Sequence, residues 1–217
     1  MVRVLECLGI MVFVGLAGAA FRQLLQPLTL DALCFSLFAL PLAYFAADLL
    51  SGLIHWVCDS FGCGATPIWG PLLVAPFRRH HHSPLQITQI SLAENLGSSA
   101  IAGSLVLGFT LPPPAGSLAG TQAFFWHLWL WFIVFGVVSN LFHRWSHLPA
   151  AHKPHWMQVL QRWGLILNSQ EHLRHHQRPY RINYCILCGW ANALTNRVPW
   201  SRLESALALL GIKTNFD

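Results

Sequence analysis

Long apolar runs separated by short polar segments dominate the pattern of this 217-residue chain. Four runs stand out, at residues 4–21, 32–57, 97–111 and 123–142. A helix that crosses a bilayer needs about 20 mostly apolar residues, so the second and fourth runs are long enough and the third is the weakest by length. We therefore expect an all-α, polytopic membrane protein with about four transmembrane helices, built as a single membrane-embedded domain over residues 1–217.

The first run allows two interpretations. Glu6 interrupts it, and Ala17-Gly18-Ala19 resembles the small-residue cleavage site of a signal peptide. The length of the run and its internal glutamate favour a first membrane helix. In the second run, Pro41 predicts a kink.

The segment after the fourth run, residues 148–217, contains no apolar stretch long enough to span a bilayer. Two apolar patterns occur in it at helical spacing: Trp156, Leu160, Trp163 and Leu167, then Trp200, Leu203, Leu207 and Leu210. Helices with such an apolar stripe suit a membrane–water interface, so we expect an interfacial or cytoplasmic tail.

Composition and charge support a membrane protein with a defined orientation. Only 10% of the residues are charged, whereas soluble domains carry about 25%. With four spans, the ends of the second and fourth runs, the 58–97 loop and the tail lie on one side. That side carries every Lys and Arg except Arg22, so the positive-inside rule makes it the cytoplasmic face.

Histidines gather in four groups, all on this predicted face. The groups are His55 with Asp59, His80 with His81, His143 with His147, and His172 with His175 and His176. Histidines four residues apart share one face of a helix, the spacing with which an H-E-x-x-H motif holds a metal ion. We therefore expect a histidine-rich cap that binds metal through these nine side chains.

The number of ligands favours a two-metal centre, because an ordinary zinc site takes four. Imidazole suits iron, zinc or copper. Two iron ions agree best with a site beside lipid, since activation of a C–H bond needs redox chemistry that zinc lacks. His82 stays ambiguous, and Cys58-x4-Cys63 with Cys185-x2-Cys188 would be an alternative zinc site, although packed free thiols are commoner.

Other polar residues have less certain roles. Three isolated histidines are expected to be packed or solvated: His127, His152 and His155. Five side chains are candidates to orient ligating imidazoles through the second ring nitrogen: Asp48, Glu94, Asn95, Asn140 and Glu171. Arg78 and Arg79 are either phosphate ligands or simply part of the positive-inside charge.

The combination of HxxxH and HxxHH on a multi-span protein resembles the membrane fatty-acid desaturase superfamily. Four ordered blocks within residues 45–200 narrow the resemblance: Leu50-Ser51-Gly52-Leu53-Ile54-His55-Trp56, Pro76-Phe77-Arg78-Arg79-His80-His81, Asn140-Leu141-Phe142-His143-Arg144-Trp145-Ser146-His147, and His172-Leu173-Arg174-His175-His176 with Asn183-Tyr184-Cys185-Ile186. These are similar to the Kua/CarF-type lipid desaturases, which include plasmalogen-forming and plant phosphatidylglycerol desaturases.

This resemblance implies a lipid desaturase that uses two iron ions and O2, with a membrane lipid substrate and a cytochrome b5- or ferredoxin-like electron donor. It assigns catalysis to the eight histidines His55, His80, His81, His143, His147, His172, His175 and His176, with Asp59 at the family's acidic position. Ser83 and Ile90 depart from the plasmanyl-specific branch. Vinyl-ether formation and acyl desaturation therefore both stay open.

Other functions remain as alternatives. A lipid hydroxylase would use the same diiron site. A zinc-dependent membrane hydrolase is less favoured, because Glu171 precedes its histidine instead of following it. A metal transporter or haem protein would need histidines inside the apolar runs, which contain almost none.

Overall fold

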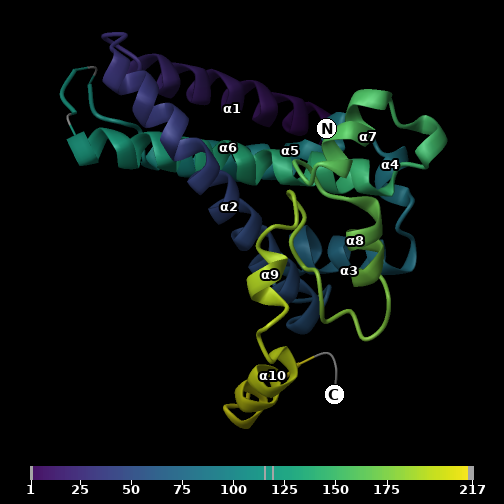
Figure 1. Cartoon of the computed structure of the whole chain (residues 1–217). Coiled ribbons are helices and arrows are strands. Elements are labelled where there is room, and N and C mark those ends of the chain that lie inside the picture. Colours follow the sequence, from purple (N-terminus) through teal and green to yellow (C-terminus); the bar gives the residue numbers. More distant parts are fainter. Residues whose placement is uncertain (1, 115, 119, 215–217) are drawn as a thin grey trace. The chain divides into compact units, whose positions relative to one another are not determined.

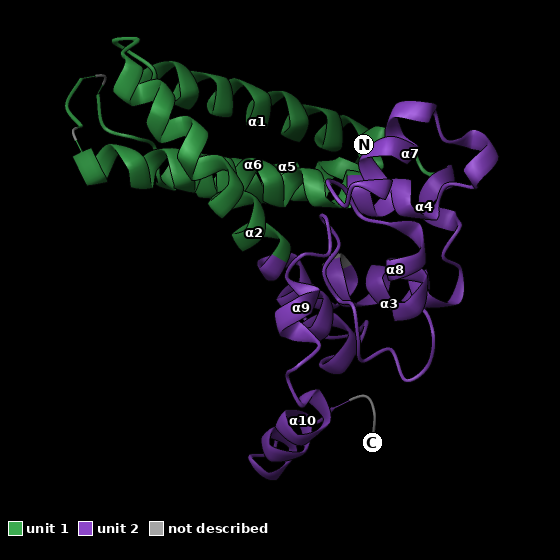
Figure 2. Cartoon of the chain, in the orientation of Figure 1, with its two compact units in different colours: residues 1–48, 90–141 green, residues 49–89, 142–217 purple. Residues whose placement is uncertain are grey.

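The computed structural model describes residues 2–114, 116–118 and 120–214 (Figure 1). Two compact units divide the chain: unit 1 comprises residues 1–48 and 90–141, and unit 2 comprises residues 49–89 and 142–217 (Figure 2). In the described part of the chain every regular element is a helix, and an isolated antiparallel bridge pairs Phe61 with Thr214. The expectation of an all-α protein is confirmed.

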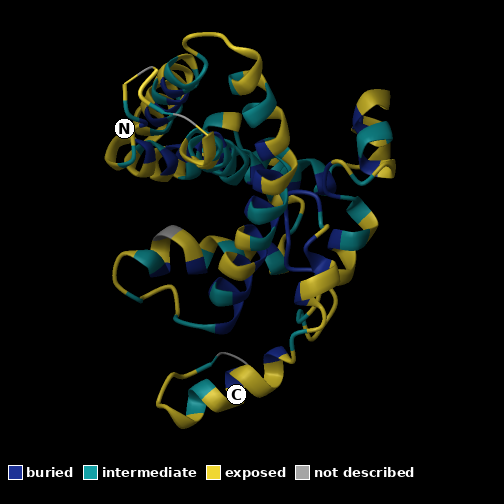
Figure 3. Ribbon diagram, turned by 60° about the vertical axis from the view of Figure 1, so that its left-hand side comes forward, coloured by how far each residue is buried: buried dark blue, intermediate teal, exposed yellow. Residues whose placement is uncertain are grey.

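Three helices are long and apolar enough to cross a membrane: α1 (Val2–Leu24), α2 (Leu30–Ser60) and α6 (Gly120–His147). They contain the first, second and fourth apolar runs of the sequence. Helix α2 continues through Pro41. Along α1, large apolar side chains such as Met11 and Val14 are 60% and 62% exposed, the surface that a lipid-facing helix needs (Figure 3).

The third apolar run lies in α5 (Leu92–Phe109), which starts earlier than predicted and is not one of these three helices. Its start is set by Ser91, whose hydroxyl accepts a hydrogen bond from the backbone N–H of Glu94 at 3.1 Å. A serine followed three residues later by glutamate is a helix-start signal. The apolar run of the sequence therefore marks only the later part of this helix.

Glycines allow α5 to pack closely on its neighbours within unit 1. A Cβ atom at Gly97 would lie 2.5 Å from Cβ of Glu6 and 2.9 Å from its Cα, and one at Gly103 would lie 2.7 Å from Val137. Small residues at such contacts let helix backbones approach each other in membranes. The core around them contains Phe13, Ala17, Ala20, Ala100, Leu107, Leu130, Ile133 and Val137.

Unit 2 joins the ends of α2 and α6 to short helices. These are η1 (Gly70–Val74), α3 (Ala75–His82), α4 (Gln86–Gln89), η2 (Ala150–His152), α7 (His155–Arg162), α8 (Ser169–His175), α9 (Asn192–Thr195) and α10 (Trp200–Leu209). Helix α7 is shorter than the stripe Trp156–Leu167 predicts, and Leu167 is buried beyond its end. Trp156 and Trp163 are 51% and 70% exposed, so only the first part of that stripe is an outward apolar surface.

The close approach at Gly97 predicts a large effect of a small change. Gly97→Val would drive methyl groups into the Glu6 backbone, which cannot move aside, so we expect α5 to lose its packing on α1 at a cost of about 1–3 kcal/mol. Thermal unfolding in detergent measures the loss. Gly108→Val on the same helix is the matched control, because nothing lies within 4 Å of a Cβ there. Equal melting temperatures for the two variants would contradict the packing described.

Candidate metal centre

The last turns of the two long helices α2 and α6 present the first ligand pairs. On α2, His55 Nε2 lies 3.5 Å from an oxygen of Asp59, one turn later. On α6, the Nε2 atoms of His143 and His147 are 3.3 Å apart. Both pairs have the four-residue spacing that places side chains on one helix face.

Two short helices supply the remaining imidazoles. Helix α3 carries His80 and His81 in its last turn, and α8 carries His172 and His175, with His176 at its C-cap. Asn168 begins α8 by accepting a hydrogen bond from the backbone N–H of Gln170 at 2.8 Å. All these residues belong to unit 2.

The first cluster, the five-histidine group, brings together imidazoles from α3, α6 and α8. Its ligand atoms lie within 4.8 Å of one another, and its members are His80, His143, His147, His172 and His176. The Nε2 atoms of His143 and His172 are 2.8 Å apart, and those of His80 and His147 are 2.9 Å apart. These are the distances of atoms that share a proton or a metal ion.

The second cluster, the aspartate group, consists of His55, Asp59, His81 and His175. His81 Nε2 lies 3.1 Å from each carboxylate oxygen of Asp59. His175 Nε2 lies 3.4 Å from that carboxylate and 3.0 Å from His55 Nε2. The two groups adjoin, because the rings of His172 and His175 on α8 are 5.7 Å apart.

Hydrogen bonds to the backbone orient two rings of the aspartate group so that it could hold a metal ion. His55 Nδ1 lies 2.9 Å from the carbonyl oxygen of Tyr184, and His175 Nδ1 lies 2.8 Å from that of Ile182. A carbonyl only accepts, so each Nδ1 carries a proton, and a ring with that single proton presents Nε2 as an acceptor. The two Nε2 atoms and the Asp59 carboxylate converge, an arrangement that a proton or a metal ion among them would stabilise.

The protonation of the short-helix histidines also suits metal binding. Burial, reinforced by neighbouring imidazoles, lowers the pKa of His80, His172 and His176 well below the usual value. These rings are therefore neutral at physiological pH, and the neutral imidazole is the form that ligates a metal ion.

The loop that follows α8 holds the aspartate group in place, and sequence reasoning missed its role. Asn183 has a φ of 56°, and its side-chain amide donates to the Glu171 carbonyl at 2.9 Å. The Ile186 N–H donates to the Ser51 hydroxyl at 3.0 Å. A Cβ at Gly52 would lie 2.6 Å from the Cys185 sulfur, so this glycine lets the loop approach α2. The block Asn183–Ile186 was visible in the sequence, but its carbonyl contacts were not.

Several candidate residues lie outside the two groups. Arg78 donates to the carbonyls of Cys58, Phe61 and Gly62 at 3.2, 2.9 and 2.7 Å, so its guanidinium closes the end of α2. Exposed residues include Arg79, His82, His152 and His155. All six cysteines are free, and neither metal-capable group among the described residues contains one.

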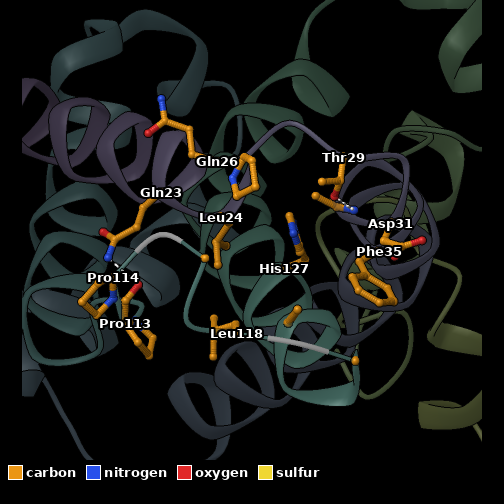
Figure 4. Close-up of a pocket in the computed structure, with 15 residues that line it drawn as sticks. Gln23, Leu24, Gln26, Thr29, Asp31, Phe35, Pro113, Pro114, Leu118 and His127 are labelled. Atoms are coloured by element: carbon orange, nitrogen blue, oxygen red, sulfur yellow. Dashed lines mark hydrogen bonds between the residues drawn. The ribbon is translucent and has the colours of Figure 1, made fainter.

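His127, expected to be a packed histidine, is buried in unit 1. It lines a cavity of about 320 Å³ together with residues from the end of α1, the start of α2 and the start of α6, among them Leu24, Thr29, Asp31 and Phe35 (Figure 4). Along α6 it precedes His143 by about 24 Å, at roughly 1.5 Å per residue. His127 thus belongs to neither group.

Comparison with known proteins identifies relatives of the chain. The lipid desaturase domain profile matches residues 44–216. Plasmanylethanolamine desaturase 1 of Mus musculus is 34% identical over 179 residues, covering 79% of this chain and 65% of that protein. Plasmanylethanolamine desaturase of Myxococcus xanthus is 35% identical, covering 88% of this chain and 66% of that protein.

A plant relative is similar over a smaller share of its length. Chloroplastic fatty acid desaturase 4 of Arabidopsis thaliana is 35% identical over 162 residues, covering 74% of this chain and 48% of that protein. The chain therefore spans about two thirds or less of each of these relatives. No solved structure matches the chain significantly.

The two groups predict how metal content responds to histidine substitution. His143→Ala removes an Nε2 atom that lies 2.8 Å from His172 Nε2, so we expect the purified protein to lose at least one bound metal ion per chain. His127→Ala is the matched control, because it replaces another buried histidine of α6 that belongs to neither group. Metal analysis after reconstitution with ferrous iron measures both. Equal loss from His127→Ala would show that the site has been placed wrongly.

Proposed function

Because this chain belongs to the lipid desaturase domain family, we propose that it introduces a double bond into a phospholipid-linked acyl or alkyl chain. One observation carries the proposal. The nine side chains of the two groups converge, and all of them fall within the matched segment 44–216. Three long apolar helices agree with an integral membrane protein that meets its lipid substrate in the bilayer.

Two iron ions are the cofactors that we propose, one for each group. Bound iron supplies the redox chemistry by which O2 attacks an unreactive C–H bond, whereas zinc has no redox chemistry. The eight histidines of the two groups are the proposed catalytic set, and Asp59 is the proposed carboxylate ligand. The converging acceptors of the aspartate group and the neutral rings of the five-histidine group support this assignment.

The protein's own part is to hold these donors and keep the site dry. His55 and His175 are 0% exposed, and backbone carbonyls fix the tautomer of each ring. A fixed tautomer keeps the lone pair of Nε2 directed into the site, as outer hydrogen bonds do in other metal sites. The substrate chain must then be oriented so that one C–C bond faces the site.

The balance of the reaction implies an electron donor. Removal of two hydrogens from adjacent carbons supplies two electrons and two protons, whereas reduction of O2 to two molecules of water consumes four of each. The remaining two electrons must come from an external reductant, and the remaining two protons from solvent. We propose a cytochrome b5- or ferredoxin-like donor, in keeping with the family.

For the membrane arrangement we propose four spans, with α5 as the span added to α1, α2 and α6. Its close packing on α1 through Gly97 supports this assignment. The two groups then lie on the cytoplasmic face, which carries nearly all of the Lys and Arg residues. We propose that the whole chain works as one membrane-embedded domain, with the segment after α6 completing the site.

The substrate is proposed only as a class. The names of the relatives include plasmanylethanolamine desaturases and a fatty acid desaturase. Both an ether-linked alkyl chain and an ester-linked acyl chain are therefore candidates. Hydroxylation at the same site is the second candidate reaction, since it differs only in whether oxygen returns to the carbon.

The proposed topology predicts which loops a membrane-impermeant thiol reagent reaches. In a variant whose native cysteines are replaced by serine, we expect Ser117→Cys, after α5, to be labelled in intact cells. Gln86→Cys, before α5, should be labelled only after permeabilisation. Both positions are exposed. Labelling of both positions in intact cells, or of neither, would mean that α5 does not cross the membrane.

The proposed reaction predicts a change in membrane lipids. Expression of the chain should create vinyl-ether or unsaturated acyl chains that lipid mass spectrometry detects, and His175→Ala should abolish them because it removes a donor of the aspartate group. His152→Ala, at an exposed histidine, should leave product formation unchanged.

Oxygen and the metal identify the reaction class. The purified protein should contain about two non-haem irons, show no Soret absorption and require O2. A protein that carries zinc and hydrolyses lipid without O2 would instead be a hydrolase. Products that carry a hydroxyl group in place of a double bond would identify a hydroxylase.

A further inference from the structure

Lys153, in the turn before α7, is a buried cation with two neutral hydrogen-bond partners. Its side chain is 9% exposed, and burial lowers its pKa. The ammonium donates to the Gln161 side-chain oxygen at 2.9 Å and also to the Ser169 hydroxyl. Lysine is rarely buried without a structural reason.

The side-chain amide nitrogen of Gln161, on α7, connects α7 to α6 and to the segment before α8. Its nitrogen donates to the Leu167 carbonyl at 2.9 Å and to the Trp145 carbonyl on α6 at 3.4 Å. Because Lys153 can only donate, it requires the amide oxygen to face it and the amide nitrogen to face those carbonyls. The lysine thus fixes the orientation of the amide.

Ser169, the first residue of α8, completes the connection to α6. Its hydroxyl donates to the Ser146 carbonyl at 2.5 Å and accepts from Lys153. The Trp145 and Ser146 carbonyls belong to the last turn of α6, where helical i+4 N–H partners run out. The Trp145 carbonyl also accepts from the Leu148 N–H at 3.4 Å. One buried network therefore links the end of α6, α7 and the start of α8.

The ligands of the five-histidine group flank this network. Ser146 precedes His147 on α6, and His172 follows Ser169 by about one turn of α8. We propose that Lys153, Gln161 and Ser169 are positioning residues that set the spacing between α6 and α8, and thereby the ligand geometry of the five-histidine group. This inference rests on the proposed function, because it concerns the metal that this group would hold.

The aspartate group is held mainly by different contacts. His55 and His175 are fixed by the carbonyls of Tyr184 and Ile182, and the loop that carries these carbonyls is tied to α2 through Ser51. A weakened network should therefore affect one metal position more than the other. A general loss of folding would affect both.

The test is a ferrous iron titration of the full-length, metal-free protein in detergent under anaerobic conditions. Lys153→Met keeps the apolar stem and removes the charge and the donors. Loss of a direct hydrogen-bond partner of a ligand lowers metal affinity by about 10–100-fold. Lys153 acts through residues that neighbour the ligands, so we expect one of two iron affinities to fall by about tenfold, the lower end of that range, and the other to stay within about twofold. Lys213→Met, at an exposed lysine, is the matched control and should bind like the wild type.

Two variants, each lacking one ligand group, show which of the two iron sites Lys153→Met weakens. With the aspartate group disabled by His55→Ala, Lys153→Met should lower the remaining affinity. With the five-histidine group disabled by His147→Ala, it should not. Lys153→Arg keeps a cationic donor, so it should bind iron more tightly than Lys153→Met. If Lys153 only filled space, arginine and methionine would weaken iron binding equally.

The outcomes separate the inference from the proposed function. A wild-type protein that binds no iron would contradict the proposed function. Two tight iron sites in both the wild type and Lys153→Met would overturn the positioning role alone, as would equal weakening of both sites. If Lys153→Met does not fold, Ser169→Ala decides in its place, since it removes the link to Ser146 without adding volume.

Discussion

The constraint on which unit 2 depends is the convergence of bare acceptor atoms in a dry interior. The Nε2 atoms of His55 and His175 face each other at 3.0 Å, and both residues are fully buried. Such an arrangement is unfavourable until a cation joins it. The surrounding structure must therefore hold these rings against their own repulsion, and backbone carbonyls do so from behind.

This requirement gives the irregular loop after α8 a role beside the helices of unit 2. Helices place ligands at fixed spacing but expose no free carbonyl groups along their length, because each carbonyl is used within the helix. The carbonyls that fix His55 and His175 come from a loop, and the carbonyls that receive Ser169 and Gln161 come from the last turn of α6. Loops and the last turns of helices are the parts whose carbonyl groups can accept such hydrogen bonds.

The sequence predicted the ligand pairs better than their supports. The spacing of His55 with Asp59 and of His143 with His147 is a property of one helix, so it can be read locally. The division into two groups depends on long-range contacts, and no local pattern reveals that His81 joins Asp59 while His80 joins His147. The backbone partners of Arg78 could not be read from the sequence for a similar reason, since they are carbonyls of residues 16–20 positions away. The third apolar run was the weakest by length, and nothing local in the sequence revealed that its glycines allow close packing of α5.

The contact between His55 and Tyr184 also bears on the order in which the protein is completed. These residues are 129 positions apart in the chain, so a ribosome that adds 5–20 residues per second needs roughly 6–26 s to supply the second after the first. The nascent helix α2 spends that interval without the carbonyl that fixes its histidine. The aspartate group is thus assembled only after the apolar helices have been synthesised, so the proposed metal could bind only once the bilayer-embedded part of the protein already exists.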